Sequence, residues 1–250
     1  MTLVVIETGD GSHTLFDTAK NIYYRSLQGA RSEADQVFVG ASGIADRPSP
    51  WWVLELGLGT GLNFLATAEA ALRHPAAPQL VYTAVEAAPL TPEILTSLPH
   101  ERGLKHPWLK QLLNEALDAA QQHAVTTVSH GPISLILYAG RWQETVLPAS
   151  LSVDAIYHDP FGPGNNPEAW TADCFAWSAS HLDPAGLLVT YGAATQVRRA
   201  MVTAGLSIGA LPGPGTKREM TVAAKDPAAL AAARSFDGVA ARLLPIQRYS

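Results

Sequence analysis

The strongest fold signal in this chain is the stretch Trp51-Trp52-Val53-Leu54-Glu55-Leu56-Gly57-Leu58-Gly59-Thr60-Gly61. Its apolar start predicts a buried strand, which leads into a loop with glycine at every second position. A helical pattern follows from residue 61 to residue 73 and ends before Pro75. Because glycine has no side chain, backbone N–H groups of such a loop can approach a charged ligand closely. The stretch therefore predicts a strand–loop–helix unit that binds a cofactor.

The spacing of these glycines distinguishes two kinds of cofactor loop. A dinucleotide loop follows G-x-G-x-x-G, in which the third glycine lets the helix pack on the strand. Here Leu62 occupies that third position, and the glycine falls one residue earlier, at Gly61. This spacing, with Glu55 before the loop, is typical of S-adenosylmethionine (SAM)-dependent methyltransferases. A plain glycine-rich turn and, more distantly, an NAD-dependent oxidoreductase remain alternatives.

Composition indicates a protein with a sizeable core and no membrane span. The 250 residues are 47% hydrophobic and 16% charged, and no apolar run reaches 18 residues. The first 12 residues have no basic region, so they do not read as a signal peptide. The single cysteine, Cys174, excludes an internal disulfide and is expected to be a packed thiol. We expect a cytoplasmic protein with neither a membrane nor a metal ion among its partners.

Charge is unevenly distributed along the chain. The net charge of −5 argues against a protein that coats nucleic acid. Residues 191–225 nevertheless carry five cations and one acid, Glu219. A local basic patch of this kind can bind a phosphate backbone, although an ordinary solvated face has the same composition. The five cations are Arg198, Arg199, Lys217, Arg218 and Lys225.

Strands and helices alternate from Trp51 onward. The patterns predict strands over 51–57, 79–87, 134–139, 153–159, 187–192, 206–211 and 218–224, and helices over 61–73, 107–123, 167–181 and 194–204. Asn166 is the expected N-cap of the third helix, with Pro167 as its first residue. The order predicts a Rossmann-like α/β fold, with a seven-stranded, mostly parallel sheet and helices on both faces. The last two strands have no helix between them, so the final strand is expected to be antiparallel.

The chain divides into three parts at the level of sequence. Residues 1–50 are expected to form an N-terminal extension packed on the core, and residues 51–225 the methyltransferase domain. Within that domain, residues 88–130 are longer than one crossover helix requires and contain four prolines, which predicts a helical insertion in at least two pieces. Residues 226–250 are expected to form a C-terminal tail, with a loose helix on the surface.

Three groups of residues fall at the carboxyl ends of the predicted strands, where open α/β sheets bind their ligands. They are the loop Gly57–Gly61, Glu86 after the second strand, and Asp159 after the fourth. A carboxylate at position 86 can accept hydrogen bonds from both ribose hydroxyls of a nucleoside cofactor. We expect the fourth strand to lie beside the first, so that Asp159 faces the cofactor.

The sequence Asp159-Pro160-Phe161 is similar to the Asp-Pro-Pro-aromatic motif of amino-methyltransferases. A nitrogen nucleophile must direct a lone pair at the methyl group, so its protons must point elsewhere and one must be lost. Asp159 can orient such an amine and relay its proton, or it can simply be a turn aspartate before proline. The preceding residue, His158, can be an acid–base group or a packed, hydrogen-bonded side chain.

Longer segments show a resemblance to a known family. They are LELGLGTGLNFL (54–65), AVEAAPL (84–90), HDPFGPGNNPEAWT (158–171), TYGAATQVRRAMVTAGL (190–206) and GTKREMTVA (215–223), preceded by Glu33, Val37-Phe38-Val39 and Gly43. These segments resemble the methyltransferase domain of the MnmC family, which modifies the wobble uridine of tRNA. The resemblance implies that SAM is used to convert 5-aminomethyl-(2-thio)uridine to 5-methylaminomethyl-(2-thio)uridine, with tRNA as the partner.

The resemblance also implies roles for individual residues. Asp159 would be the catalytic residue. The cofactor contacts would be Glu55, Gly57, Gly59, Gly61, Asn63 and Glu86. The substrate side would be shaped by Phe161, Asn166, Pro167 and Trp170, while Arg198, Arg199, Lys217 and Arg218 would face tRNA phosphates.

The chain departs from the family pattern in two ways. Bifunctional members carry a flavin-dependent oxidase domain, and no second glycine fingerprint is present here, so we expect a standalone methyltransferase. The family usually has a Gly-Asp pair after the third strand, where this chain has Gly140-Arg141-Trp142; Trp142 could stack on adenine instead. A same-fold methyltransferase for a small-molecule amine and a SAM- or tRNA-binding module without turnover remain alternatives.

Overall fold

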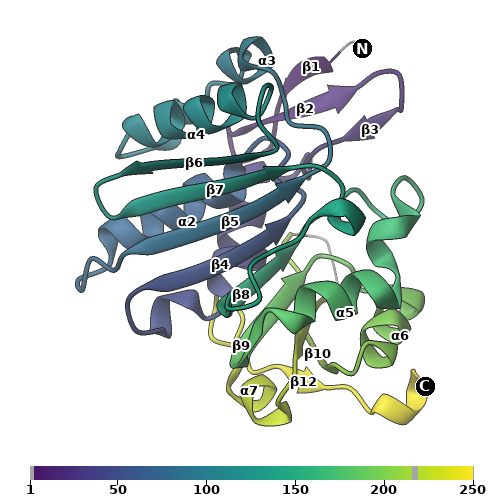
Figure 1. Ribbon diagram of the computed structural model, residues 1–250. Helices are drawn as coiled ribbons and strands as arrows, with labels where there is room; N and C mark the ends of the chain where they lie inside the picture. Colours follow the sequence, from purple (N-terminus) through teal and green to yellow (C-terminus); the bar gives the residue numbers. More distant parts are fainter. Residues whose placement is uncertain (1–2, 216–218, 250) are drawn as a thin grey trace.

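In the computed structural model, which describes residues 3–215 and 219–249, nine strands form the central sheet (Figure 1). Their order across the sheet is β12-β10-β11-β9-β8-β4-β5-β7-β6. The strands are β4 (Trp51–Leu56), β5 (Leu80–Glu86), β6 (Val125–His130), β7 (Ile133–Ala139), β8 (Val153–His158), β9 (Leu182–Thr190), β10 (Ser207–Pro212), β11 (Glu219–Ala224) and β12 (Arg242–Leu243).

The five central strands, β7-β5-β4-β8-β9, run parallel to one another. The strand β11 pairs antiparallel with β9, with Thr221 opposite Thr190, and β10 pairs antiparallel with β11. This arrangement confirms the Rossmann-like α/β class, the antiparallel final strand, and the position of β8 beside β4.

The predicted count of seven strands was too low, because each edge of the sheet carries one more strand. At one edge β6 pairs antiparallel with β7, and at the other the two residues of β12 pair with β10. The β6 sequence Val125-Thr-Thr-Val-Ser-His130 is largely exposed, so it lacks the apolar run that marks the central strands. A two-residue strand leaves no periodic pattern at all.

The helices are α1 (Ala30–Glu33), α2 (Leu62–Arg73), α3 (Pro92–Ser97), α4 (Trp108–Ala119), α5 (Ala172–Ser180), α6 (Thr195–Thr203) and α7 (Pro227–Ala232). Among residues 3–215 and 219–249, the longest, α2 and α4, have 12 residues each. None of these described helices combines the length and the apolar character that crossing a membrane requires.

The predicted helix over 167–181 was wrong at its start. Residues Pro167–Trp170 form a separate 3-10 turn (η5), and α5 begins at Ala172 because the hydroxyl of Thr171 accepts a hydrogen bond from the backbone N–H of Cys174 at 3.2 Å. Thr171 is therefore the N-cap of α5. Cys174 is fully buried in α5, as expected for a packed thiol.

The C-terminal segment is also more ordered than a loose surface helix. It contains α7, whose Leu230 is buried, then the edge strand β12 and a 3-10 turn η6 (Ile246–Arg248). Tyr249 is 4% exposed and packs in the same apolar cluster as α5 and α6. The two termini lie at opposite ends of the molecule (Figure 1).

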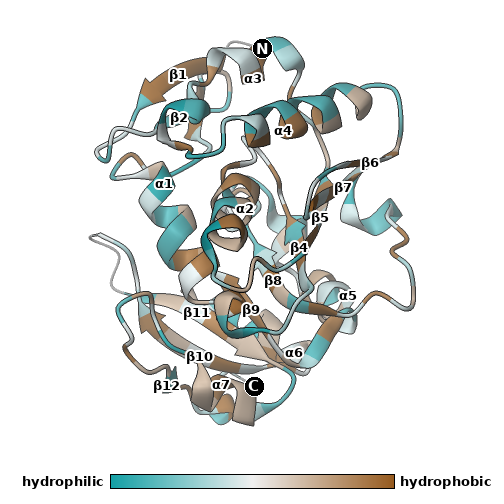
Figure 2. Cartoon of the chain, turned by 90° about the vertical axis from the view of Figure 1, so that its left-hand side faces the viewer, coloured by the Kyte–Doolittle hydropathy of each residue, from teal (hydrophilic) through white to brown (hydrophobic). Residues whose placement is uncertain are grey.

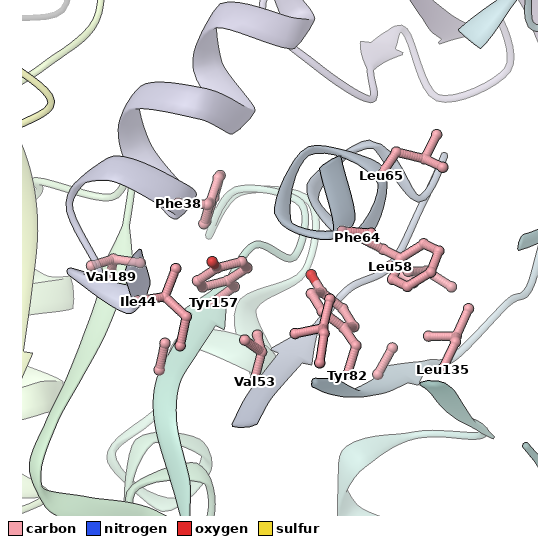
Figure 3. Packing of buried hydrophobic residues seen from close by; sticks show 14 of the residues in the cluster. Phe38, Ile44, Val53, Leu58, Phe64, Leu65, Tyr82, Leu135, Tyr157 and Val189 are labelled. Atoms are coloured by element: carbon pink, nitrogen blue, oxygen red, sulfur yellow. The ribbon is translucent and has the colours of Figure 1, made fainter. Parts of the chain in front are cut away.

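Two apolar clusters cover the two faces of the sheet, so the predicted helices on both faces are present. Along β4, successive residues point to opposite faces: Val53 packs with α2 and α4, and Leu54 packs with α5 and α6. Figure 3 shows part of the first cluster, in which Tyr82 and Tyr157 stand on neighbouring parts of the sheet beneath Phe64 of α2. Figure 2 shows α2 near the centre of the molecule, where most of its residues are buried.

The N-terminal 50 residues form a small antiparallel sheet and a helical segment. The described strands of this sheet are β1 (Leu3–Glu7), β2 (His13–Asp17) and β3 (Ile22–Tyr23). After α1, a π-helical segment η1 (Ala34–Gly40) and a 3-10 turn η2 (Ile44–Asp46) lead into β4. Leu15, Phe38 and Ile44 from this region belong to the same buried cluster as α2. Residues 20–26 therefore reach the carboxyl edge of the large sheet.

Candidate active site

The candidate site lies where β4 and β8 end side by side. These two strands are parallel, with Leu56 opposite His158, and the backbone N–H of Asp159 donates to the carbonyl of Leu56 at 3.0 Å. From β4 the chain builds β5 and β7 on one side, and then β8 and β9 on the other. This pair is therefore the switch point of the sheet, where open α/β folds form their ligand crevice.

The loop after β4 adopts a backbone that favours glycine. Gly57, Gly59 and Gly61 have φ values of 89°, 53° and 74°, in the left-handed region. A Cβ atom at position 57 would also lie only 2.8 Å from the carbonyl oxygen of Asp159. The loop can therefore take its shape, and approach β8 closely, only because glycine occupies these positions.

Glu86 lies at the end of β5, as predicted, and its carboxylate holds the glycine loop. One oxygen accepts a hydrogen bond from the backbone N–H of Gly59 and the other from that of Ala88, each at 2.9 Å. A carboxylate oxygen has two lone-pair directions, so these bonds leave capacity for further donors. The side chain is thus positioned at the junction of the glycine loop and the rim of the site.

Asp159 sits in a buried polar network beneath the glycine loop. One carboxylate oxygen, Oδ2, accepts from Asn63 Nδ2 at 2.8 Å and forms an ion pair with Arg25. The same Asn63 nitrogen donates to Glu55 Oε1 at 2.7 Å, and the Tyr82 hydroxyl donates to Glu55 Oε2 at 2.9 Å. The side chain of Asp159 is 7% exposed, so its position is fixed by these partners.

Two ionisable groups in this region titrate far from their usual ranges. Burial and, second, the nearby negative charge of Asp159 together raise the pKa of Glu55 from 4.5 to about 8. Burial lowers the pKa of His158 to about 3. Its ring packs between Trp170 and Phe175, with centroids 4.7 Å and 4.5 Å away. His158 is therefore a neutral, packed side chain at physiological pH, which resolves the two alternatives left open by the sequence.

A cavity of about 600 Å³ opens over these strand ends. Its lining combines the N-terminal segment 20–26 with the segments that follow β5, β7 and β8. Its lining includes seven of the residues predicted as site residues, namely Gly57, Gly59, Glu86, Trp142, Asp159, Phe161 and Asn166. The structure thus brings the core of the predicted site together.

Other predicted site residues support the cavity from behind. Glu55 and Asn63 are fully buried in the network under Asp159. Gly61 faces α4, where a Cβ would meet the Leu113 side chain. Trp170 is 6% exposed, and its indole N–H donates to the carbonyl of Phe161 at 2.8 Å. Their placement suits side chains that shape the loop and hold Phe161 in position.

Trp142 lies on the rim of the cavity in the 3-10 turn η4 (Trp142–Glu144). Among the described residues its buried Nε1 has no hydrogen-bond partner, and its ring packs 5.9 Å from that of Trp177. The neighbouring Arg141 lies 3.6 Å from Glu168. A planar base on this rim could stack on the face of the indole, so the residues present fit the adenine end of SAM.

The fold does not gather the described cations of the predicted basic patch on one surface. Arg198 is only 6% exposed, and its guanidinium donates to Thr221 and Glu219 at 3.1 Å and 3.0 Å. Lys225 donates a hydrogen bond to the carbonyl of Leu182, the first residue of β9. Arg199 is exposed on α6, and Lys217 and Arg218 lie outside the described residues. Arg198 therefore stabilises the packing of α6 on β11.

Sequence reasoning missed three residues that face this cavity: Tyr24, Arg25 and Tyr191. Tyr24 packs edge-on against Phe161 with ring centroids 4.9 Å apart, and the hydroxyl of Tyr191 donates to the carbonyl of Pro160 at 2.7 Å. Arg25 pairs with Asp159. Tyr191 lies near the carboxyl end of the predicted strand 187–192, which could have marked it, whereas Tyr24 and Arg25 lie in a segment without a motif.

Comparisons with known proteins agree with this geometry. Residues 104–226 match a family described as S-adenosyl-L-methionine-dependent methyltransferase. The chain is 36% identical over 210 residues to the tRNA 5-methylaminomethyl-2-thiouridine biosynthesis bifunctional protein MnmC of Cupriavidus metallidurans, covering 80% of this chain and 31% of that protein. The corresponding protein of Delftia acidovorans is 33% identical, over 82% of this chain and 32% of its own. The chain thus spans about a third of the length of these curated relatives.

A solved structure has the same fold. The crystal structure of MnmC2 from Aquifex aeolicus superimposes with a TM-score of 0.72 at 24% identity, covering 90% of this chain and 72% of that chain. The match of residues 104–226 is to a family of SAM-dependent methyltransferases, and the fold of the chain agrees with that class. Within that class, its sequence is similar to the methyltransferase part of the MnmC proteins, which confirms the resemblance seen in the sequence.

Proposed function

We propose that this protein uses SAM to methylate the primary amine of a 5-aminomethyl-(2-thio)uridine at the wobble position of tRNA. The observation that carries the proposal is the placement of Asp159, a buried carboxylate on the cavity wall that contacts the glycine loop through its own backbone. A SAM molecule bound at that loop supplies an electrophilic methyl group. Similarity to MnmC proteins supports the choice of substrate.

Asp159 suits an amine substrate for a chemical reason. An aliphatic amine is protonated in neutral water, and it can attack only after it loses one proton. A carboxylate beside the cavity attracts the ammonium form, accepts its hydrogen bonds and can receive that proton. Arg25 and Asn63 fix the other side of this carboxylate, so its orientation toward the cavity is set before the substrate arrives.

Several residues would hold the base and exclude water. Phe161 is supported by Tyr24 and by the bond from Trp170, which gives the cavity a rigid aromatic wall. Asn166, in the turn before η5, lies on the same wall and offers amide groups to a pyrimidine edge. Arg199 is exposed on α6 and would contact a tRNA phosphate. The same role is proposed for Lys217 and Arg218 from the sequence alone, since they lie outside the described residues. Because tRNA is the proposed substrate, we also expect the protein to act in the cytoplasm.

A small-molecule amine is the second candidate substrate. It is favoured by the placement of Arg198 and Lys225, which removes two cations from the predicted phosphate-binding face. A substrate without a phosphate backbone would not require that face.

The test is methyl transfer from labelled SAM to tRNA that carries an aminomethyl wobble uridine, followed by mass analysis of the nucleosides. Unmodified tRNA of the same sequence is the control. We expect methylaminomethyl-uridine in the first sample and no label in the second. If SAM binds but neither tRNA is labelled, the tRNA proposal fails and small amines become the substrates to test.

A further inference from the structure

Arg25 comes from outside the methyltransferase core yet reaches its catalytic carboxylate. It lies between β3 and α1, and its side chain is 4% exposed. The guanidinium pairs with Oδ2 of Asp159 and lies 5.6 Å from the ring centroid of Phe38 in η1. An aromatic face and a carboxylate thus hold the guanidinium from two sides, as its planar geometry allows.

The groups around Arg25 keep it charged. Glu33 of α1, Glu55 of β4, Tyr82 of β5 and Asp159 after β8 face it from four elements, and Tyr191 after β9 lies in the same cluster. Burial opposes the charge, but the negative charges of Asp159 and then Glu33 are the largest contributions that outweigh this cost and raise the pKa of Arg25. A fixed positive charge therefore stands behind the carboxylate, on the wall of the cavity.

We propose that Arg25 is the positioning residue for methyl transfer to the amine: it orients Asp159 and keeps a positive charge beside the substrate amine. This inference rests on the proposed function, because it assigns a role within the same site. The guanidinium is a stable ionic partner for Asp159 and leaves it a carboxylate. The same charge disfavours the ammonium form of a nearby amine, so it favours the neutral form that attacks. The N-terminal segment thus supplies part of the active site.

Removing the positive charge of Arg25 should shift the titrations of Asp159 and of the bound amine in the same direction, toward higher pH. Without Arg25 the Asp159 carboxylate loses an opposite charge, so its titration midpoint moves to higher pH. The bound amine loses a like charge, so it also stays protonated to higher pH. The acid limb of the kcat–pH profile should therefore shift upward, by about one pH unit or more for a partner in direct contact.

The experiment compares wild type with Arg25→Gln, Arg25→Lys and the control Arg31→Gln. Arg31 is a matched control, since it lies in the same segment and pairs with Asp35 at 2.9 Å, away from the cavity lining. One readout is the carboxyl titration of Asp159 by carbon NMR, assigned by its loss in Asp159→Asn. The other is kcat against pH with the aminomethyl-tRNA substrate, with SAM affinity and thermal unfolding measured in parallel.

We expect Arg25→Gln to shift both the NMR midpoint and the kcat limb upward and to lower kcat. We expect Arg25→Lys to keep the limb in place with a reduced kcat, and Arg31→Gln to match wild type. If Arg25→Gln keeps both the wild-type NMR midpoint of Asp159 and the wild-type acid limb of kcat against pH, the inference is overturned. If that variant does not fold, Arg25→Lys decides: a lower kcat at unchanged SAM affinity supports the role, and a wild-type kcat overturns it.

Failure of the proposed function has a different signature. In that case the wild-type protein itself transfers no methyl group to aminomethyl-tRNA. The NMR titration does not depend on turnover, so it still tests whether Arg25 controls the charge of Asp159.

Discussion

Gly57 and Asp159 are in direct backbone contact: a Cβ atom on Gly57 would lie 2.8 Å from the carbonyl oxygen of Asp159 and 3.0 Å from its carbonyl carbon. The glycine loop and the segment that carries Asp159 therefore form one packed unit, although they lie far apart in the sequence. This contact has room for a hydrogen atom and for nothing larger.

Gly57→Ala should therefore impair both stability and SAM binding. The substitution combines a left-handed φ of 89° with an overlap against backbone atoms that cannot rotate away. Gly205→Ala is the matched control, because its φ is 85° but the new Cβ would meet no atom within 4 Å. We expect the control to lose about 1–2 kcal/mol of unfolding free energy. Gly57→Ala should lose more and also weaken SAM affinity; equal losses in the two variants would contradict the packed contact.

Glu55 should make the protein less stable as the pH rises from about 5 to about 8. The native state keeps this carboxyl protonated up to its raised pKa of about 8, whereas the unfolded chain releases the proton near 4.5. Between these values the native state binds more protons, so the free energy of unfolding falls with increasing pH. Glu55→Gln cannot ionise, and it should lose less stability over this window.

Urea unfolding at pH 5.5 and pH 8 measures this difference. The exposed acid Glu144 provides the control, since Glu144→Gln should follow wild type. If wild type and Glu55→Gln lose the same stability between the two pH values, Glu55 does not titrate in this window.

Arg198 should matter for folding more than for binding. Its guanidinium donates a buried hydrogen bond to Thr221 and a partly buried one to Glu219, and Glu219 has Arg242 as a second partner at 2.5 Å. We expect Arg198→Met to cost about 1–3 kcal/mol of unfolding free energy. The neighbouring surface variant Arg199→Met should stay within about 0.5 kcal/mol of wild type. Equal stability of the two variants, measured in urea, would refute the buried role.

Arg199 should contribute to tRNA affinity through a phosphate. Arg199→Glu is expected to weaken binding at low salt and to reduce the slope of log affinity against log salt by about 0.7 to 0.9, the value for one phosphate contact. Binding at several salt concentrations tests this. An unchanged slope would show that tRNA contacts a different face.

The predictions that succeeded depend on short, local patterns. A few consecutive residues indicate each of these features: the strand before the glycine loop, the loop itself and the position of Asp159 after a strand. Parallel pairing of β4 with β8 brings them together. The same pairing rule placed Glu86 at the rim. The sequence patterns did not predict the edge strands β6 and β12, because a strand at the exposed edge of a sheet does not need an apolar run.

The predictions that the sequence could not supply involve contacts between distant segments. Arg25 and Asp159 are far apart in the sequence although they form an ion pair, and no motif marks Arg25 as part of the site. Arg198 shows the reverse case: a basic stretch reads as a surface patch until the fold places Glu219 opposite it. In the same way, the sequence does not reveal that Asn63 is buried and donates hydrogen bonds to Glu55 and Asp159.

The central claim is that the Asp159 carboxylate engages the amine that receives the methyl group. The most direct measurement compares wild type with Asp159→Asn for methyl transfer from labelled SAM to aminomethyl-tRNA, with SAM affinity measured on both proteins. We predict that the asparagine variant loses at least about 100-fold in kcat while its SAM affinity stays within a few fold. A variant that keeps the wild-type kcat would contradict the role of Asp159 and the account built on it.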